Sequence, residues 1–484
     1  MLLNSALLAV WCAFVVAVII NVDKIYAKAK LFLRQGGTLT IAWVFMFLAT
    51  GLWTMREEAV TGVGSLDVSA EIQITFVGIA SFLMILKLAS GANLRYYGML
   101  STASFLTYGL LGFMSAGVSP APALTIYKSG LILADSLLVV LALSTFCKKG
   151  YASLMLEITY SMGTLFLCGI VLGGILFPDL AVRQIGGILG YNLNGVFPVM
   201  NANDVGFFAA IAVAIGLRRM WEPGSLRGRL FWSSLTGMGF VVLFFAQART
   251  SIVAVAIVLV IYAIAIKRMR LLAGVMAAGL VSIAAFYLLT KSGLGFEDST
   301  VAYLKRGQTD QMVDSLSGRE GLWAEGLAMF KDAPLLGHGF EAGVKYGGIK
   351  YGIAEGLHMH NAHMQVLVDS GMVGYIAWVV FVSAVAIPMT IRAKKDFPAT
   401  ISSARFEIEM FCVMLIMLLR TMTGSVLVFH HYSLLLLLSM LIYLKLPKSG
   451  KRSAGTGDDS TIPFPDSKRI LAIKNASLGA VSQK

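Results

Sequence analysis

The sequence predicts an all-α fold, a polytopic transmembrane helical bundle of about 12–13 spans that carries a helical cap on one side. Of 484 residues, 57% are hydrophobic and only 13% are charged, which is more apolar surface than a soluble core could bury. The apolar residues come in runs of about 20, the length that crosses a ~30 Å hydrocarbon layer as a helix. The runs are continuous rather than alternating, so the spanning elements are helices and not strands.

The spans follow one another from the first residues to residue 446. Residues 2–22 are expected to be the first span rather than a signal peptide, because no basic segment precedes them and no cleavage pattern follows. The short runs near 205, 409 and 432 are consistent with re-entrant segments as well as with spans. The apolar runs are 4–22, 37–55, 72–90, 97–118, 129–146, 154–177, 205–217, 231–246, 251–266, 271–290, 371–391, 409–422 and 432–446.

The distribution of Lys and Arg predicts the orientation. Most of the 39 basic residues fall in alternate loops and in the tail, and this side is expected to be the cytoplasm. The N-terminus then lies outside and the C-terminus inside. The net charge of +13 follows from this bias, so nucleic acid is not an expected partner, whereas the lipid bilayer is.

Two segments are not expected to lie in the membrane. Residues 447–484 are rich in Ser, Gly, Lys and Asp without an apolar period, which is typical of a disordered tail. Residues 291–363 form a long external loop, and loops of that length are usually functional or disordered. Because 318–331 has helical character, we expect a folded cap. The predicted organisation is a bundle over 1–290, the cap over 291–363, C-terminal spans over 364–446 and the tail over 447–484.

Twelve basic residues fall on the external side, and several lie against apolar runs. Arg249 stands in the short turn QART, and Arg420 directly follows MLIMLL. A guanidinium in a bilayer costs about 2.5–3.5 kcal/mol at the midplane and less at the ends. Snorkelling to headgroups accounts for a single arginine. Arginines at the outer ends of several spans are better explained together as a site for a lipid-linked phosphate or diphosphate, because guanidinium binds phosphate oxygens bidentately.

The motif HMHNAHMQ over 358–365 holds three of the six histidines where the cap returns to the membrane. A metal site is one interpretation, but no Cys and no HExxH accompanies the histidines. General acid–base catalysis fits better, since histidine titrates near neutrality. Packing or surface roles are the alternative for all three, and the stronger one for His358 and His363. No phosphate-binding Walker loop, serine elbow or external DxD pair is present.

Five motifs in order resemble the bacterial O-antigen ligase and polymerase family, the multispan glycosyltransferases that consume undecaprenyl-diphosphate-linked glycans. The resemblance covers residues 119–374 and leaves the first third without a motif. The sequence QARTS differs from the family's Ser-Arg-Thr turn before Arg249, which removes a hydroxyl. The motifs are SPAPALTIYK, RQIGGILGYNLNGVFPVMNAND, QARTS, GREGLWAEGLAMFKDAPLLGHGF and HNAHMQVLVDSGMVG.

The resemblance implies a GT-C-like fold and an inverting, metal-independent glycosyl transfer without a cofactor. It implies that Arg183, Arg249 and Arg319 bind the donor diphosphate, with Lys128 and Arg420 as further candidates. His360 is the expected base or acceptor-orienting residue, and it forms the catalytic set with Arg249 and Arg319. The residues expected to position sugars are Asn361, Gln365 and Asn203.

The sequence leaves the acceptor open. A polymerase joins one lipid-linked glycan to another in surface polysaccharide or exopolysaccharide synthesis, and a ligase moves the finished glycan to the lipid A core of lipopolysaccharide. A protein-directed transferase is a third alternative. The SPAP loop and the cap favour a polymerase slightly, and a chain-length regulator would then be a partner. A lipid-linked glycan flippase is the more distant alternative, because transporters more often show internal repeats and mid-membrane charges.

Overall fold

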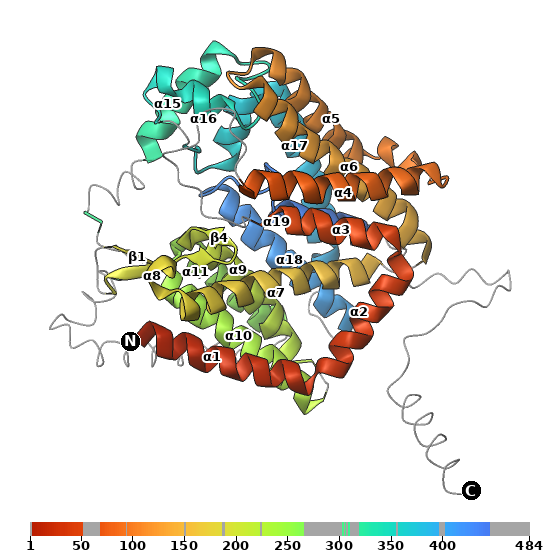
Figure 1. Ribbon diagram of the computed structural model, residues 1–484, viewed down its shortest axis with the longest axis vertical. Helices are drawn as coiled ribbons and strands as arrows, with labels where there is room; N and C mark the ends of the chain where they lie inside the picture. The colour runs from red at the N-terminus through yellow and green to blue at the C-terminus, as the bar shows by residue number, and fades with distance from the viewer. Residues whose placement is uncertain are drawn as a thin grey trace, which may run out of the picture. The chain divides into compact units, whose positions relative to one another are not determined.

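The computed structural model describes residues 2–51, 68–92, 94–149, 152–185, 189–222, 225–265, 303, 305, 308–309, 319–354, 357–395 and 402–445. These residues form an all-α polytopic membrane protein, as predicted (Figure 1). A helix overlaps every predicted apolar run except 271–290, which lies outside the described residues, as does the predicted tail. The division into bundle, cap and C-terminal spans remains a prediction.

The helices before the cap are α1 (Leu2–Ile20), α2 (Val22–Gly36), α3 (Thr38–Ala49), α4 (Val68–Ala89), α5 (Leu100–Met114), α6 (Pro122–Lys149), α7 (Ala152–Leu176), α8 (Pro178–Ala181), α9 (Ala202–Met220), α10 (Leu226–Ala246) and α11 (Arg249–Ala265). The cap contributes α15 (Arg319–Asp332) and α16 (Gly343–Gly347), and α17 (Ala362–Lys395), α18 (Ser402–Thr421) and α19 (Tyr432–Leu444) follow. Short 3-10 helices cover Arg95–Gly98, Ser115–Val118 and Gly348–Tyr351.

Six of the described helices are long and apolar enough to cross a membrane: α1, α4, α6, α7, α10 and α17. The apolar helices α3, α11 and α19 are shorter. The helix predicted within the cap, over 318–331, is α15. In contrast, the basic loop expected after the first span contains α2, which the hydropathy pattern did not predict because lysines and other polar residues separate its apolar ones.

Helix α9 lies at the centre of one half of the bundle, in contact with α7, α10, α11 and α18 (Figure 1). Every residue of α9 from Val205 to Arg219 is buried, as expected for a helix that is apolar all round. Asn201 begins the helix, because its side-chain oxygen accepts hydrogen bonds from the backbone N–H groups of Asn203 and Asp204. This N-cap fixes the N-terminal end of α9 and with it the position of Asp204.

The other end of α9 is held by a buried ion-pair network. Arg218 Nε donates to Glu409 Oε2 at 2.5 Å, and Arg219 Nη2 donates to Glu409 Oε1 at 2.7 Å. Arg219 also pairs with Glu157 of α7 at 2.6 Å. The Glu409 side chain is fully buried. The Glu409 carboxylate is therefore a countercharge shared by Arg218 and Arg219. The network joins α7, α9 and α18.

The variant Glu409→Gln is expected to lower the free energy of unfolding by about 3–5 kcal/mol, because it leaves two buried guanidiniums without their shared countercharge. Denaturant unfolding in detergent micelles measures this loss. Glu407→Gln is the matched control on the same helix, since its carboxylate lies 3.9 Å from Arg392 Nη1 and makes a weaker pair. Equal stability of the two variants would contradict the assignment.

Two short hairpins precede α9, and the sequence did not predict them. Strand β1 (Val182–Gln184) pairs antiparallel with β2 (Tyr191–Leu193), and β3 (Gly195–Val196) pairs with β4 (Val199–Met200). The Phe197–Pro198 peptide bond between β3 and β4 is cis. These strands are too short for an alternating pattern to be visible in the sequence.

Candidate active site

The cap is anchored where its PLLGHGF segment meets a break in α17. Gly371 interrupts the helix with φ 63° and ψ −170°. Around the break, His338 N donates to Val368 O at 2.9 Å, Gly339 N to Asp369 O at 3.0 Å, and Met372 N to Pro334 O at 2.8 Å. Two motifs that the sequence analysis identified separately thus form one backbone-bonded unit.

The variant Gly371→Ala is expected to loosen the cap. Its φ of 63° disfavours a side chain, and an added Cβ would lie 2.2 Å from the backbone oxygen of Leu335. We expect a lower unfolding midpoint in detergent and faster proteolysis within 319–354. Gly78→Ala in α4 is the control, because nothing lies within 4 Å of its added Cβ. Unchanged proteolysis of the cap in Gly371→Ala would argue against this anchor.

The same cap segment also contacts residues on either side of the SPAPAL segment, 119–124. Phe340 N donates to Ser115 Oγ at 3.0 Å, and Thr125 Oγ1 donates to Phe340 O at 3.1 Å. On the other side of the cap, Trp323 Nε1 donates to Met359 O at 2.9 Å, so Trp323 ties α15 to the histidine motif. These contacts fix Arg319, at the start of α15, relative to His360.

Three of the predicted arginines come together at this end of the bundle. Arg249 begins α11, Arg319 begins α15 and Arg420 lies in the last turn of α18. Partial burial lowers the pKa of Arg319, and the positive charges of Arg420 and Arg249 lower it further. Arg319 is therefore close enough to both Arg420 and Arg249 for their charges to interact, and we call the three residues the arginine group.

Two members of the arginine group, Arg249 and Arg420, are oriented by hydrogen bonds. Arg249 Nη2 donates to Gln308 Oε1. Arg420 Nη2 donates to Asp204 Oδ1 at 3.0 Å, and its Nη1 donates to Thr423 O at 2.9 Å. Arg420 is only 6% exposed, and its Nε has no hydrogen-bond partner among the described residues. Among the described residues, Asp204 is the one carboxylate that opposes the three guanidiniums, which leaves excess positive charge.

His360 is exposed beside this group, in a left-handed backbone conformation with φ 49°. Partial desolvation lowers the pKa of its imidazole, the charges of Arg319 and Arg420 lower it further, and Asp204 opposes them. The arrangement favours a neutral imidazole near pH 7, which is the form that accepts a proton. The arrangement therefore places guanidinium groups near an imidazole that is able to accept a proton.

The other predicted site residues lie elsewhere or are engaged within the protein. Arg183 is exposed on β1, opposite Asn192 of β2, and none of its described contacts joins it to the arginine group. Lys128 pairs with Glu341 at 3.1 Å. Asn203 lies in the first turn of α9 and is partly exposed.

The two amide residues of the HNAHMQ motif, Asn361 and Gln365, form hydrogen bonds at the start of α17. Asn361 Oδ1 accepts from His363 N at 2.9 Å and Met364 N at 3.2 Å, as a helix N-cap does. Gln365 is fully buried. Its Oε1 accepts a hydrogen bond from Met359 N at 2.9 Å, and its Nε2 donates to Asp369 Oδ2 at 2.7 Å. These contacts occupy the whole Gln365 side chain, so we do not place it in contact with a sugar.

The structure adds two residues that the sequence analysis missed. Asp204 pairs with Arg420, and His431 lies next to both, since burial lowers the pKa of His431 while Asp204 raises it and Arg420 lowers it. Both had a sequence signal that was not used. Asp204 is an acidic residue directly after the Asn-x-Asn motif, and His431 belongs to a His pair that opens the final apolar run.

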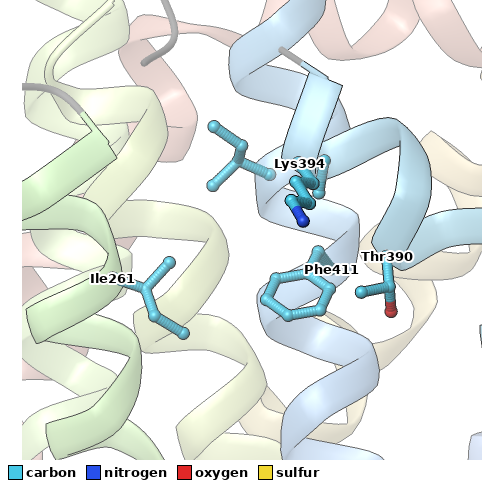
Figure 2. Close-up of a pocket in the computed structure, with 6 residues that line it drawn as sticks. Ile261, Thr390, Lys394 and Phe411 are labelled. Carbon is cyan, nitrogen blue, oxygen red and sulfur yellow. The ribbon is translucent and has the colours of Figure 1, made fainter. Parts of the chain in front are cut away.

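A cavity of about 300 Å³ lies away from these residues, among α11, α17 and α18. Figure 2 shows Lys394 and Phe411 at this cavity, with Ile261 of α11 facing them. Lys394 is near the end of α17, whereas His360 precedes its start. After the break at Gly371, the helix runs for roughly 35 Å to Lys394 at 1.5 Å per residue, so the cavity is separate from the candidate active site.

Comparison with known proteins points to the same part of the chain. Residues 234–379 match the family model described as O-antigen ligase. No curated protein matches the chain. The matched segment contains Arg249, Arg319 and His360, together with the contacts between the cap and α17. Residues 234–379 are therefore similar to the O-antigen ligase family, and this similarity supports the resemblance of the chain to the O-antigen ligase/polymerase family.

Proposed function

We propose that the protein is an inverting, metal-independent glycosyltransferase that takes its glycan from an undecaprenyl-diphosphate-linked donor. The observation that carries the proposal is the convergence of Arg249, Arg319 and Arg420, from three segments distant in the sequence, beside a histidine held neutral. Excess guanidinium charge suits a diphosphate. The neutral imidazole suits deprotonation of a sugar hydroxyl.

In the proposed reaction, the arginine group stabilises the negative charge that develops on the departing diphosphate. His360 accepts the proton of the acceptor hydroxyl as the hydroxyl oxygen attacks the anomeric carbon from the face opposite the diphosphate. One carbon–oxygen bond forms as the bond to the diphosphate breaks, which inverts the anomeric configuration. Undecaprenyl diphosphate and the extended glycan are the products.

The proposed location is a bacterial inner membrane, with the site on the periplasmic side and the C-terminus in the cytoplasm. Support comes from the basic loops: Lys24 of α2, Arg218 and Arg219 of α9, and Arg392 and Lys394 of α17 lie at helix ends away from the arginine group. Positive residues favour the cytoplasmic side.

Among the acceptors, we favour a growing surface polysaccharide, which makes the protein a polymerase with a chain-length regulator as a partner. Transfer to the lipid A core, as in an O-antigen ligase, is the second candidate. The matched family model carries the ligase description, so both remain in the proposal.

The test incubates purified protein in detergent with a lipid-linked oligosaccharide, with and without lipid A core. Longer lipid-linked chains support the polymerase, and glycan on lipid A core supports the ligase. Because detergent provides no second compartment, a flippase would change neither substrate. Unchanged substrates under all conditions would contradict the proposed function.

A further inference from the structure

A second set of charged residues lies between the cap and α6. Glu341 Oε1 is 3.1 Å from Lys128 Nζ and 3.8 Å from Lys345 Nζ, and His358 is near enough for its charge to act on this carboxyl. We call these four residues the Glu341 group. Glu341 is only 6% exposed. The group joins the SPAPALTIYK motif to the residue that follows PLLGHGF.

The Glu341 carboxyl is held ionised in an unusual backbone conformation. Burial acts to raise its pKa, but Lys128, Lys345 and His358 outweigh that effect and lower it. Its φ is 58°, a left-handed conformation that residues other than glycine seldom adopt. Such conformations persist where the surrounding structure enforces them, and they cluster at functional sites.

The histidine motif contributes to both groups, because His360 interacts with the arginine group and His358 belongs to the Glu341 group. The charges acting on His360 come from Arg319, Arg420 and Asp204. The charges acting on His358, two residues earlier, come from Lys345, Glu341, His360 and Lys128, and with burial they lower its pKa to about 4. His358 therefore carries a charge only in acid, and near pH 7 it is neutral while Lys128 and Lys345 hold Glu341 ionised. Its Nδ1 is buried without a hydrogen-bond partner among the described residues.

The two groups differ in the chemistry that they can bind. Among the described residues, the arginine group has three guanidiniums against the one carboxylate of Asp204, which fits a diphosphate. A buried, ionised Glu341 would repel a diphosphate, but a carboxylate and two ammonium groups together accept from and donate to hydroxyls. A sugar with several hydroxyls supplies both kinds of partner. His360 interacts with the arginine group and with His358 of the Glu341 group, so it is near enough to serve a donor bound at the one and an acceptor bound at the other.

We propose that the Glu341 group binds the acceptor glycan, with the Glu341 carboxylate accepting a hydrogen bond from an acceptor hydroxyl and Lys128 or Lys345 donating to another. This inference rests on the proposed function, and it assigns Glu341 and Lys128 to acceptor recognition rather than to the diphosphate. It also predicts that the identity of the acceptor sugar is selected here.

The test needs donor and acceptor to be varied separately. A lipid-linked donor whose own acceptor hydroxyl is replaced by hydrogen cannot be extended, so a soluble oligosaccharide serves as the only acceptor. In Glu341→Gln we expect the KM for the acceptor to rise about tenfold or more, as for the loss of a hydrogen bond to a charged group. The KM for the donor should stay within about twofold, since the arginine group is intact. Glu325→Gln, on α15 of the same cap, is the matched control and should behave as wild type.

Acceptor analogues that each lack one hydroxyl distinguish recognition of the acceptor by Glu341 from a structural role of Glu341. For one such acceptor, the wild-type KM should rise to the value of Glu341→Gln, and the variant should show no further rise. An equal penalty in both proteins for every acceptor would overturn the inference, as would an unchanged acceptor KM. If Glu341→Gln does not accumulate in the membrane, Lys128→Met carries the same comparison. If this inference fails, glycan transfer by wild type in these assays still supports the proposed function.

Discussion

Replacing His360 by alanine is expected to lower kcat for glycan transfer about 10²–10⁴-fold, the usual contribution of a positioned general base. His363→Gln is the matched control from the same motif, because the His363 ring contacts Tyr375 and Trp378 rather than the arginine group. Both variants should reach the membrane in wild-type amounts. Full activity of His360→Ala would remove the base from the proposed mechanism.

The pH profile tests the same residue through its neighbours. A base must be deprotonated, so kcat/KM falls as the pH drops through the pKa of His360. That pKa is lowered from 6.5 by desolvation, Arg319 and Arg420, and raised by Asp204. Arg319→Gln should therefore move the acidic limb to higher pH, and Asp204→Asn should move it to lower pH. Shifts in the same direction would contradict the assignment of His360.

Replacing either Arg249 or Arg319 by alanine is expected to lower kcat about 10²–10³-fold, the range found when one group that stabilises transition-state charge is removed. The physical reason is that the diphosphate gains negative charge as the glycosidic bond breaks, and water replaces a fixed guanidinium poorly. Arg319 is partly desolvated, which strengthens its interaction with an anion. Single-turnover rates with a lipid-linked donor measure the effect.

Arg229→Ala is the matched control for these two variants, because Arg229 is exposed near the start of α10, at the opposite end of that helix from Arg249. It should transfer glycan at the wild-type rate. Losses of the same size in all three variants would mean that total positive charge matters and that the position of the guanidinium does not.

The sequence predicted the fold well because hydropathy alone determines which segments enter a membrane. A helix overlaps each apolar run that falls within the described residues, and α15 appeared where helical character was expected in the cap. Helix α2 and the hairpins before α9 were missed, because the former is amphipathic and the latter are only two or three residues per strand. Their stability comes from tertiary contacts.

The sequence predicted which residues are candidates for the site, but not which of them lie together. Arg249 and Arg420 were identified because charge against an apolar run requires an explanation, whereas Arg319 and His360 were identified from motifs that resemble the family's. Which cations share a site depends on helix packing, and inside a bilayer packing is not driven by the hydrophobic pattern that the sequence displays. Lys128 was therefore grouped with the arginines, although it pairs with Glu341. Gln365 was expected to meet a sugar, although it satisfies buried groups around α17.

The most direct test of the central claim is equilibrium binding of a prenyl diphosphate and the matching prenyl monophosphate to purified protein in detergent. If the arginine group is a diphosphate site, wild type binds the diphosphate more tightly, and Arg249→Ala and Arg319→Ala lose most of that preference while Arg229→Ala keeps it. Equal affinity for the two lipids in wild type, or an unchanged preference in both arginine variants, would contradict the account.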